Sequence, residues 1–121
     1  MKQLRLYADS NGESHFEDIE VAMELSDFAP PAQALYRSAF EHTDQLVFLE
    51  LPAGWGGLAH KSPAKQALFC LSGSMEVIAS DGTKRTVEAG DVWRMEDTTG
   101  KGHKTTVTSK NSVYAAVVQL K

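Results

Sequence analysis

Apolar and polar residues alternate with a period of two along most of the chain, the pattern of a β-strand with one buried face. Between His15 and Leu25, for example, the apolar residues Ile19, Val21 and Met23 alternate with acidic residues or alanine. We expect a half-buried strand over residues 15–25.

Nine further segments share this character: each is short, rich in β-branched or aromatic residues, and bounded by Gly, Asp, Asn, Ser or Pro. They are residues 3–8, 34–40, 45–51, 66–72, 75–79, 84–88, 92–95, 103–109 and 112–120. The pattern predicts about ten strands and no long helix. Short strands separated by regularly spaced turns indicate an all-β fold, an antiparallel sandwich or barrel.

Turn residues, and two strands that are apolar on both faces, add detail to the predicted fold. Asp81-Gly82, between two predicted strands, has the composition of a two-residue type I′ hairpin. Pro30-Pro31 predicts a loop. Residues 66–72 and 112–120 are apolar on both parities, so both faces of these strands need cover, from a second sheet or from a partner subunit.

Composition narrows the functional classes. The 121 residues suit a single domain, 1–121, and the net charge of -4 comes from interspersed signs, so nucleic acid is not an expected partner. No signal peptide and no apolar run long enough for a membrane span is present, which favours a cytoplasmic protein without a membrane partner. Cys70 lies in an apolar run and is expected to be a buried thiol.

Two spaced motifs suggest a family. In the first motif, five, one, three and six residues separate the successive positions Gly54, His60, Ser62, Gln66 and Gly73. The second motif starts at the glycine and aspartate of residues 90–91 and ends at the histidine of position 103. Their order and spacing resemble the two motifs of the cupin family, particularly small bacterial single-domain cupins, over nearly the whole chain. The resemblance implies a cupin-type double-stranded β-helix, a jelly-roll barrel with a pocket inside.

The same resemblance implies a metal site, altered in this chain. Cupins carry histidine where this chain has Ser62 and glutamate where it has Gln66, so His60, Gln66 and His103 are the tentative metal ligands. Imidazoles suit Fe, Mn, Ni or Zn, but a neutral amide in place of a carboxylate lowers the expected affinity. Trp55 lies in a glycine-rich loop and is expected either to cover the pocket or to pack on the surface under the loop.

The remaining polar residues leave alternatives open. Taken alone, His103 favours the interpretation of a hydrogen-bonding turn histidine, and its position in the motif brings a role in the pocket level with it. Replacing a histidine at a solvated turn by alanine would cost within about 0.5 kcal/mol. His15 and Glu17 share the parity of Ile19, which suggests the hypothesis that they replace the missing ligands at the barrel mouth. The pair formed by residues 96 and 97 is adjacent in a strand, so its two carboxylates are expected to face opposite ways and to cap a turn.

Several function classes compete. A phosphate-binding loop and a serine hydrolase are excluded because their glycine signatures are absent. The first hypothesis is a small-molecule-binding barrel with a degenerate metal site and no assigned catalytic residue. The alternatives are a metal-dependent dioxygenase or isomerase using His60, Gln66 and His103, and a structural or oligomerisation module. The family resemblance also implies a homodimer.

Overall fold

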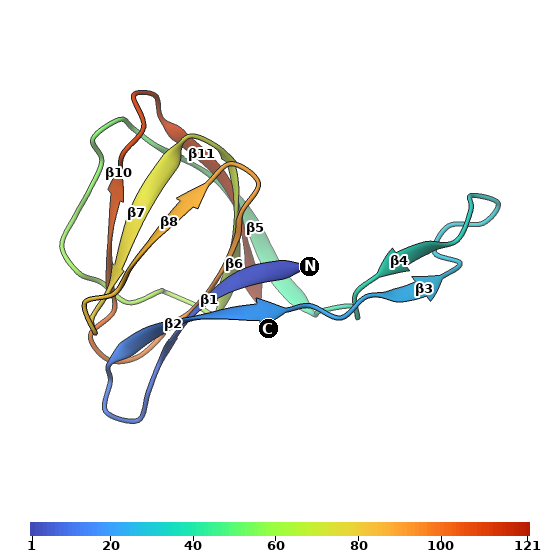
Figure 1. Ribbon diagram of the computed structural model, residues 1–121, viewed down its shortest axis with the longest axis horizontal. Coiled ribbons are helices and arrows are strands. Elements are labelled where there is room, and N and C mark those ends of the chain that lie inside the picture. Colours follow the sequence, from blue (N-terminus) through green and yellow to red (C-terminus); the bar gives the residue numbers. More distant parts are fainter.

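Eleven β-strands and no helix make up the fold in the computed structural model, which describes residues 1–121 (Figure 1). The strands are β1 (Lys2–Ala8), β2 (Ser14–Glu20), β3 (Glu24–Ser26), β4 (Leu35–Arg37), β5 (Thr43–Leu51), β6 (Gln66–Ser72), β7 (Ser74–Ala79), β8 (Lys84–Glu88), β9 (Val92–Glu96), β10 (His103–Val107) and β11 (Val113–Leu120). The all-β prediction is confirmed. The structure contains no helix of the length and apolarity that a membrane crossing requires.

Two sheets face each other and form the predicted jelly-roll barrel, a double-stranded β-helix. The larger has the order β2-β1-β9-β6-β11-β5 and the smaller the order β10-β7-β8. Pairing is antiparallel except between β1 and β9, which run parallel from Leu4↔Trp93 to Tyr7↔Glu96. The inward parity of each strand fills the core, as with Val77 of β7 and Val117 of β11.

The predicted strand over residues 15–25 is two strands. The pairing of β1 with β2 ends at Lys2↔Glu20, and the chain forms its next strand only at Glu24, where β3 pairs with β4 instead of β1. The inward parity also differs from the prediction, because Ser14 is buried and Phe16 packs against the core. The Ser14 hydroxyl donates to the carbonyl of Gly102 at 2.7 Å, which fixes this register from inside the barrel.

Residues 21–42, here called the arm, project away from the barrel (Figure 1). Within the arm, β3 and β4 pair only with each other, and the predicted Pro30-Pro31 loop lies between them. The predicted strand over residues 34–40 is reduced to three residues because its only partner is the equally short β3. At the base, the Glu41 carboxylate forms an ion pair with Arg94 of β9.

The hairpin at Asp81-Gly82 is present, but its turn is not type I′. Type I′ needs positive φ at both central residues, whereas only Gly82 has it, at 90°. The Gly82 N–H donates to the Ala79 carbonyl, and the Ala79 N–H donates to Thr83. The loop therefore has three residues, and the Asp81 carboxylate stabilises it by accepting the backbone N–H of Thr83 at 2.9 Å.

Close backbone packing explains the Gly-Lys-Gly sequence before β10. Gly102 has φ of +75°, and a Cβ there would lie 2.2 Å from the carbonyl oxygen of His60. A Cβ at Gly100 would likewise lie 2.2 Å from the carbonyl oxygen of Gly12. Both glycines are needed where two chain segments touch, and Gly102 brings β10 against the segment that carries His60.

Candidate functional site

One cavity of about 210 Å³ opens into the barrel interior and gathers the residues singled out by the motifs. Its polar or aromatic lining includes Trp55, His60, Gln66, Trp93 and His103, and its apolar lining includes Leu49, Leu51, Leu68, Met75, Met95 and Val117. The two motifs therefore meet around a pocket that is mostly apolar, with polar groups on part of its wall, as in many small-molecule sites.

His103 is the first residue of β10, is 2% exposed, and is held by a buried carboxylate. Its Nδ1 lies 2.6 Å from Oδ2 of Asp97, and the hydroxyl of Ser62 donates to Oδ1 of the same carboxylate at 2.7 Å. A carboxylate only accepts, so Nδ1 carries the proton that it donates to Asp97. This arrangement fixes the imidazole ring and leaves Nε2 for another partner.

Two buried nitrogens of residues that line the cavity have no hydrogen-bond partner in the protein. They are Nε2 of His103 and Nε1 of Trp93. A buried polar atom left unpaired costs about 1–3 kcal/mol, so most such atoms in folded proteins are paired. The pocket thus offers polar atoms that the protein itself does not satisfy.

Aromatic packing and backbone pairing hold the His103 ring. Trp93 meets it edge-on, with ring centroids 5.2 Å apart and an interplanar angle of 78°. His60, an exposed residue, has its ring tilted by 53° against the His103 ring, with the centroids 4.8 Å apart. The backbones of His60 and His103 exchange two hydrogen bonds of 3.0 Å, so the two motif histidines are fixed side by side.

Gln66 and Trp55 also line the cavity, each held by contacts of its own. The buried Gln66 amide donates to Sδ of Met95 at 3.4 Å and accepts from Gln119 at 3.2 Å. The Trp55 carbonyl accepts the Val107 N–H at 2.7 Å, which pairs the glycine-rich loop with β10. The Trp55 side chain is 39% exposed and lies where the cavity meets solvent.

The donor set around the cavity does not fit a resident metal ion. No group of three or more His, Cys, Asp or Glu side chains is placed to hold one. One nitrogen of His103 bonds Asp97, Nδ1 of His60 bonds the Leu58 carbonyl at 3.1 Å, and the Gln66 amide is engaged elsewhere. Two imidazole nitrogens remain, fewer than the three protein ligands usual in a catalytic zinc site.

The hypothesis that His15 and Glu17 complete this site is wrong. His15 points to two acids, with Nε2 at 2.7 Å from Asp9 and Nδ1 at 2.9 Å from Asp81, and Glu17 bonds Arg5 at 2.6 Å. The hydrogen bonds to Asp9 and then to Asp81 raise the pKa of His15 above its ordinary value. His15 therefore links the β1–β2 turn to the β7–β8 turn, outside the cavity.

Sequence reasoning missed the roles of Asp97 and Trp93. Asp97 is fully buried, whereas its neighbour Glu96 bonds Arg5 at 3.1 Å, so the two acids do face opposite ways as predicted. The parity of β9 carried the missing signal: Trp93, Met95 and Asp97 all lie on the inward face. The sequence indicated that Ser62 is a lost metal ligand, whereas in the structure its hydroxyl donates a hydrogen bond to the Asp97 carboxylate.

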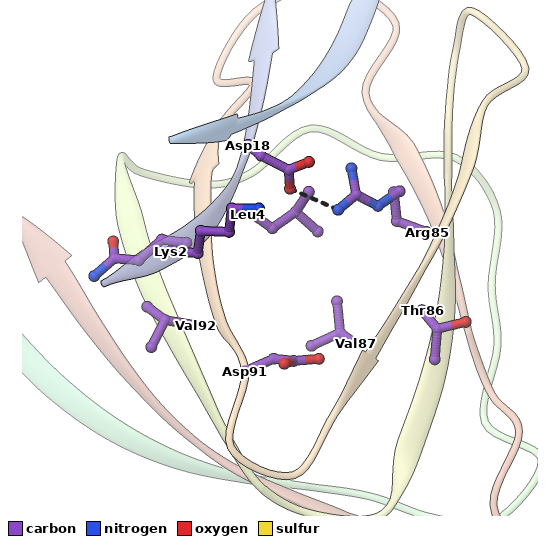
Figure 2. A pocket seen from close by; sticks show the side chains of 9 residues that line it. Lys2, Leu4, Asp18, Arg85, Thr86, Val87, Asp91 and Val92 are labelled. Atoms are coloured by element: carbon purple, nitrogen blue, oxygen red, sulfur yellow. Dashed lines mark hydrogen bonds and ion pairs between the residues drawn. The ribbon is translucent and has the colours of Figure 1, made fainter. Parts of the chain in front are cut away.

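A second hollow, of about 130 Å³, lies between β1, β2 and β8 (Figure 2). Asp18 and Arg85 face each other across it and form an ion pair of 2.6 Å. Its lining has no imidazole and no aromatic ring. The barrel cavity, which gathers both motif histidines and two tryptophans, is the candidate functional site.

In comparisons with known proteins, the chain resembles only solved structures. No family model and no curated protein sequence matches the chain. Among solved structures, NMB1881 of Neisseria meningitidis is 17% identical, with 83% of each chain covered and a TM-score of 0.49. The Cnp3 cupin domain of Schizosaccharomyces pombe is 15% identical over 89% of this chain and 73% of that one, with a TM-score of 0.49. An RmlC-like cupin family protein of Methanocaldococcus jannaschii, with a double-stranded β-helix fold, is 20% identical over 84% and 91%, with a TM-score of 0.47.

Proposed function

We propose that the barrel cavity binds one small, largely apolar molecule that carries a hydroxyl group. The observation that carries this proposal is that two cavity-lining residues each have a buried nitrogen without a hydrogen-bond partner, Nε2 of His103 and Nε1 of Trp93. A hydroxyl is both a donor and an acceptor, so one such group has the chemistry to pair with both nitrogens.

The positions of the protons on His103 and Trp93 determine which hydrogen bond the ligand hydroxyl donates and which it accepts. In the neutral form of His103 that donates its Nδ1 proton to Asp97, Nε2 carries a lone pair that accepts the ligand's O–H. The indole N–H of Trp93 is only a donor and gives its proton to the ligand oxygen. Ser62 keeps the Asp97 carboxylate in place, so the polar end of the pocket is organised before the ligand arrives.

Cavity size limits the ligand to a fragment-sized molecule. A dry apolar cavity of about 150 Å³ holds one benzene molecule, and the volume here is about 210 Å³. A six-membered ring with one substituent therefore fits. The aliphatic lining from β5, β6 and β11 supplies the apolar contact, and a single hydrogen-bonding group sets the orientation.

Phenol and toluene provide a matched pair of probes, measured by calorimetry. They have similar size, and a purely apolar cavity prefers toluene because phenol loses more hydration. We expect the reverse here: phenol binds with a Kd on the order of 0.1–1 mM, and toluene binds about 5- to 10-fold more weakly because it leaves both nitrogens unpaired.

Substitutions show whether the named nitrogens are responsible. His103→Phe removes the acceptor and Trp93→Phe removes the indole donor, and each is expected to abolish the preference for phenol. His42→Phe is the matched control, because His42 lies exposed outside the cavity. A wild-type protein that binds toluene as tightly as phenol, or binds neither, contradicts the proposal, and the second outcome favours an inert structural barrel.

A further inference from the structure

A groove lies where the arm leaves the barrel (Figure 1). Its volume is about 370 Å³, within the range of about 300–1,000 Å³ that is usual for ligand pockets. The lining comes from the two ends of the arm and from β9, and it combines three small aliphatic side chains with four charged ones: Glu24, Arg37, Glu41 and Arg94. The groove is separate from the barrel cavity, with which it shares no lining residue.

Arg94 and Glu41 neutralise each other on the barrel side of this groove. Both terminal nitrogens of Arg94 donate to the Glu41 carboxylate, Nη1 at a distance of 3.0 Å. Two parallel hydrogen bonds of this kind fix the guanidinium and the carboxylate in one plane. The buried Nε of Arg94 has no hydrogen-bond partner. This pair therefore leaves one donor unused but adds no net charge to the groove.

Arg37 is held in place without an acidic partner. Its Nε donates to the Ser26 hydroxyl at 3.3 Å, and its Nη1 donates to the Ser38 carbonyl at 2.9 Å. Its guanidinium also lies over the ring of Phe40, 4.6 Å from the centroid. Each of the other three arginines in the chain forms an ion pair with an acid. The positive charge of Arg37 is therefore positioned but not neutralised.

Glu24 supplies a complementary negative charge. It lies directly opposite Arg37 in the β3–β4 pair, where Cβ atoms are about 5 Å apart and opposite charges commonly attract each other. The two side chains form no ion pair here, since the guanidinium donates to Ser26 and Ser38 instead. The groove thus has one unpaired positive charge and one unpaired negative charge within reach of a single small molecule.

We propose that the groove binds a zwitterion, an α-amino acid with a short aliphatic side chain. The α-carboxylate pairs with Arg37, because a guanidinium matches the geometry of a carboxylate, and the α-ammonium pairs with Glu24. The aliphatic side chain lies against Val21, Ala22 and Ala39 of the lining. A simple carboxylate would be repelled by Glu24 and a simple amine by Arg37, so the charges favour a ligand that carries both groups. The inference is independent of what the barrel cavity binds.

Three probes separate the contributions of the two charges. Leucine carries both charged groups, 4-methylpentanoate lacks the ammonium, and 3-methylbutylamine lacks the carboxylate. Each probe is titrated at neutral pH into the ¹⁵N-labelled full chain and followed by NMR. Leucine is expected to shift the amide resonances of residues 21–24 and 37–41 with a Kd on the order of 1 mM. Each analogue is expected to bind at least about 10-fold more weakly, because one charged group then has no partner.

Substitutions test the two residues that carry the charges. Arg37→Gln and Glu24→Gln are each expected to weaken leucine binding at least about 10-fold. The matched controls are Arg85→Gln and Glu76→Gln, which lie in the smaller sheet outside the groove and are expected to keep the wild-type Kd. Glu24 is exposed, so Glu24→Gln is expected to fold as the wild type does, which the dispersion of its NMR spectrum checks.

Four results overturn the proposal. Leucine that causes no saturable shift at the two ends of the arm shows that Arg37 and Glu24 are merely solvated charges. An analogue that binds as tightly as leucine excludes recognition of a zwitterion, and so does an Arg37→Gln or Glu24→Gln variant with wild-type affinity. Competition between leucine and saturating phenol shows that leucine enters the barrel cavity instead. If phenol does not bind at all, the shifts at the arm still decide this proposal separately.

Discussion

Replacing His103 by alanine removes the partner of a buried carboxylate. Asp97 and His103 are 0% and 2% exposed, and removing the hydrogen-bond donor of a buried carboxylate leaves its charge less compensated, at a cost of about 3–5 kcal/mol. Because the Ser62 hydroxyl still donates to Asp97, we expect the lower end of that range, about 3 kcal/mol. For a chain of 121 residues this corresponds to a Tm lower by roughly 10–15 °C.

Urea unfolding of wild type, His103→Ala and His60→Ala measures this cost directly. His60 is exposed, so its replacement is expected to change the free energy of unfolding by only about 0.5 kcal/mol. The double variant Asp97→Ala/His103→Ala is expected to lose less than the sum of the single variants, with a coupling of about 1–3 kcal/mol. A His103→Ala protein within about 0.5 kcal/mol of wild type refutes the reasoning and restores the solvated-turn alternative.

Three further predictions follow from the contacts around the barrel. Gly102→Ala is expected to cost more than about 1–2 kcal/mol in urea unfolding, because positive φ is unfavourable for alanine and its Cβ meets the His60 backbone; a near-neutral variant contradicts the close approach. His15→Gln is expected to lower the Tm at pH 5.5 but not at pH 9.5. The His15 pKa is raised by Asp9 and Asp81, so its stabilisation is complete below about pH 6.5 and is lost as pH rises through the raised pKa; an equal effect at both pH values counts against these ion pairs. Protein purified without a histidine tag is expected to hold less than one equivalent of Fe, Mn, Ni or Zn by elemental analysis, and a stoichiometric metal supports the metal-dependent enzyme instead.

The fold was accessible from sequence because strand parity and turn residues are local signals. The apolar alternation in residues 75–79 predicted β7 and the face that it buries, and the apolar run in residues 112–120 predicted β11. The error at residues 15–25 came from the same rule: alternation does not show where a strand changes its pairing partner, and here β2 pairs with β1 whereas β3 pairs with β4. The arm was missed for this reason.

The site was only partly predictable. Motif spacing brought His60, Gln66 and His103 to one cavity, but the hydrogen bonds of these side chains depend on segments distant in sequence. Ser62 and Asp97 are 35 residues apart and bond to each other. Considered without its partner, Ser62 is interpreted as a lost metal ligand and Asp97 as an acidic residue that caps a turn. The apolar lining is likewise set by the packing of strands from both sheets, which periodicity does not encode.

The ¹⁵N resonances of the histidine side chains, followed by NMR during a phenol titration, test the central claim most directly. The account predicts that Nε2 of His103 shifts in a saturable manner while its Nδ1, held by Asp97, changes little and His42 does not respond. A titration that leaves Nε2 of His103 unmoved while phenol binds elsewhere, or that moves all four histidines alike, contradicts a ligand site at this nitrogen.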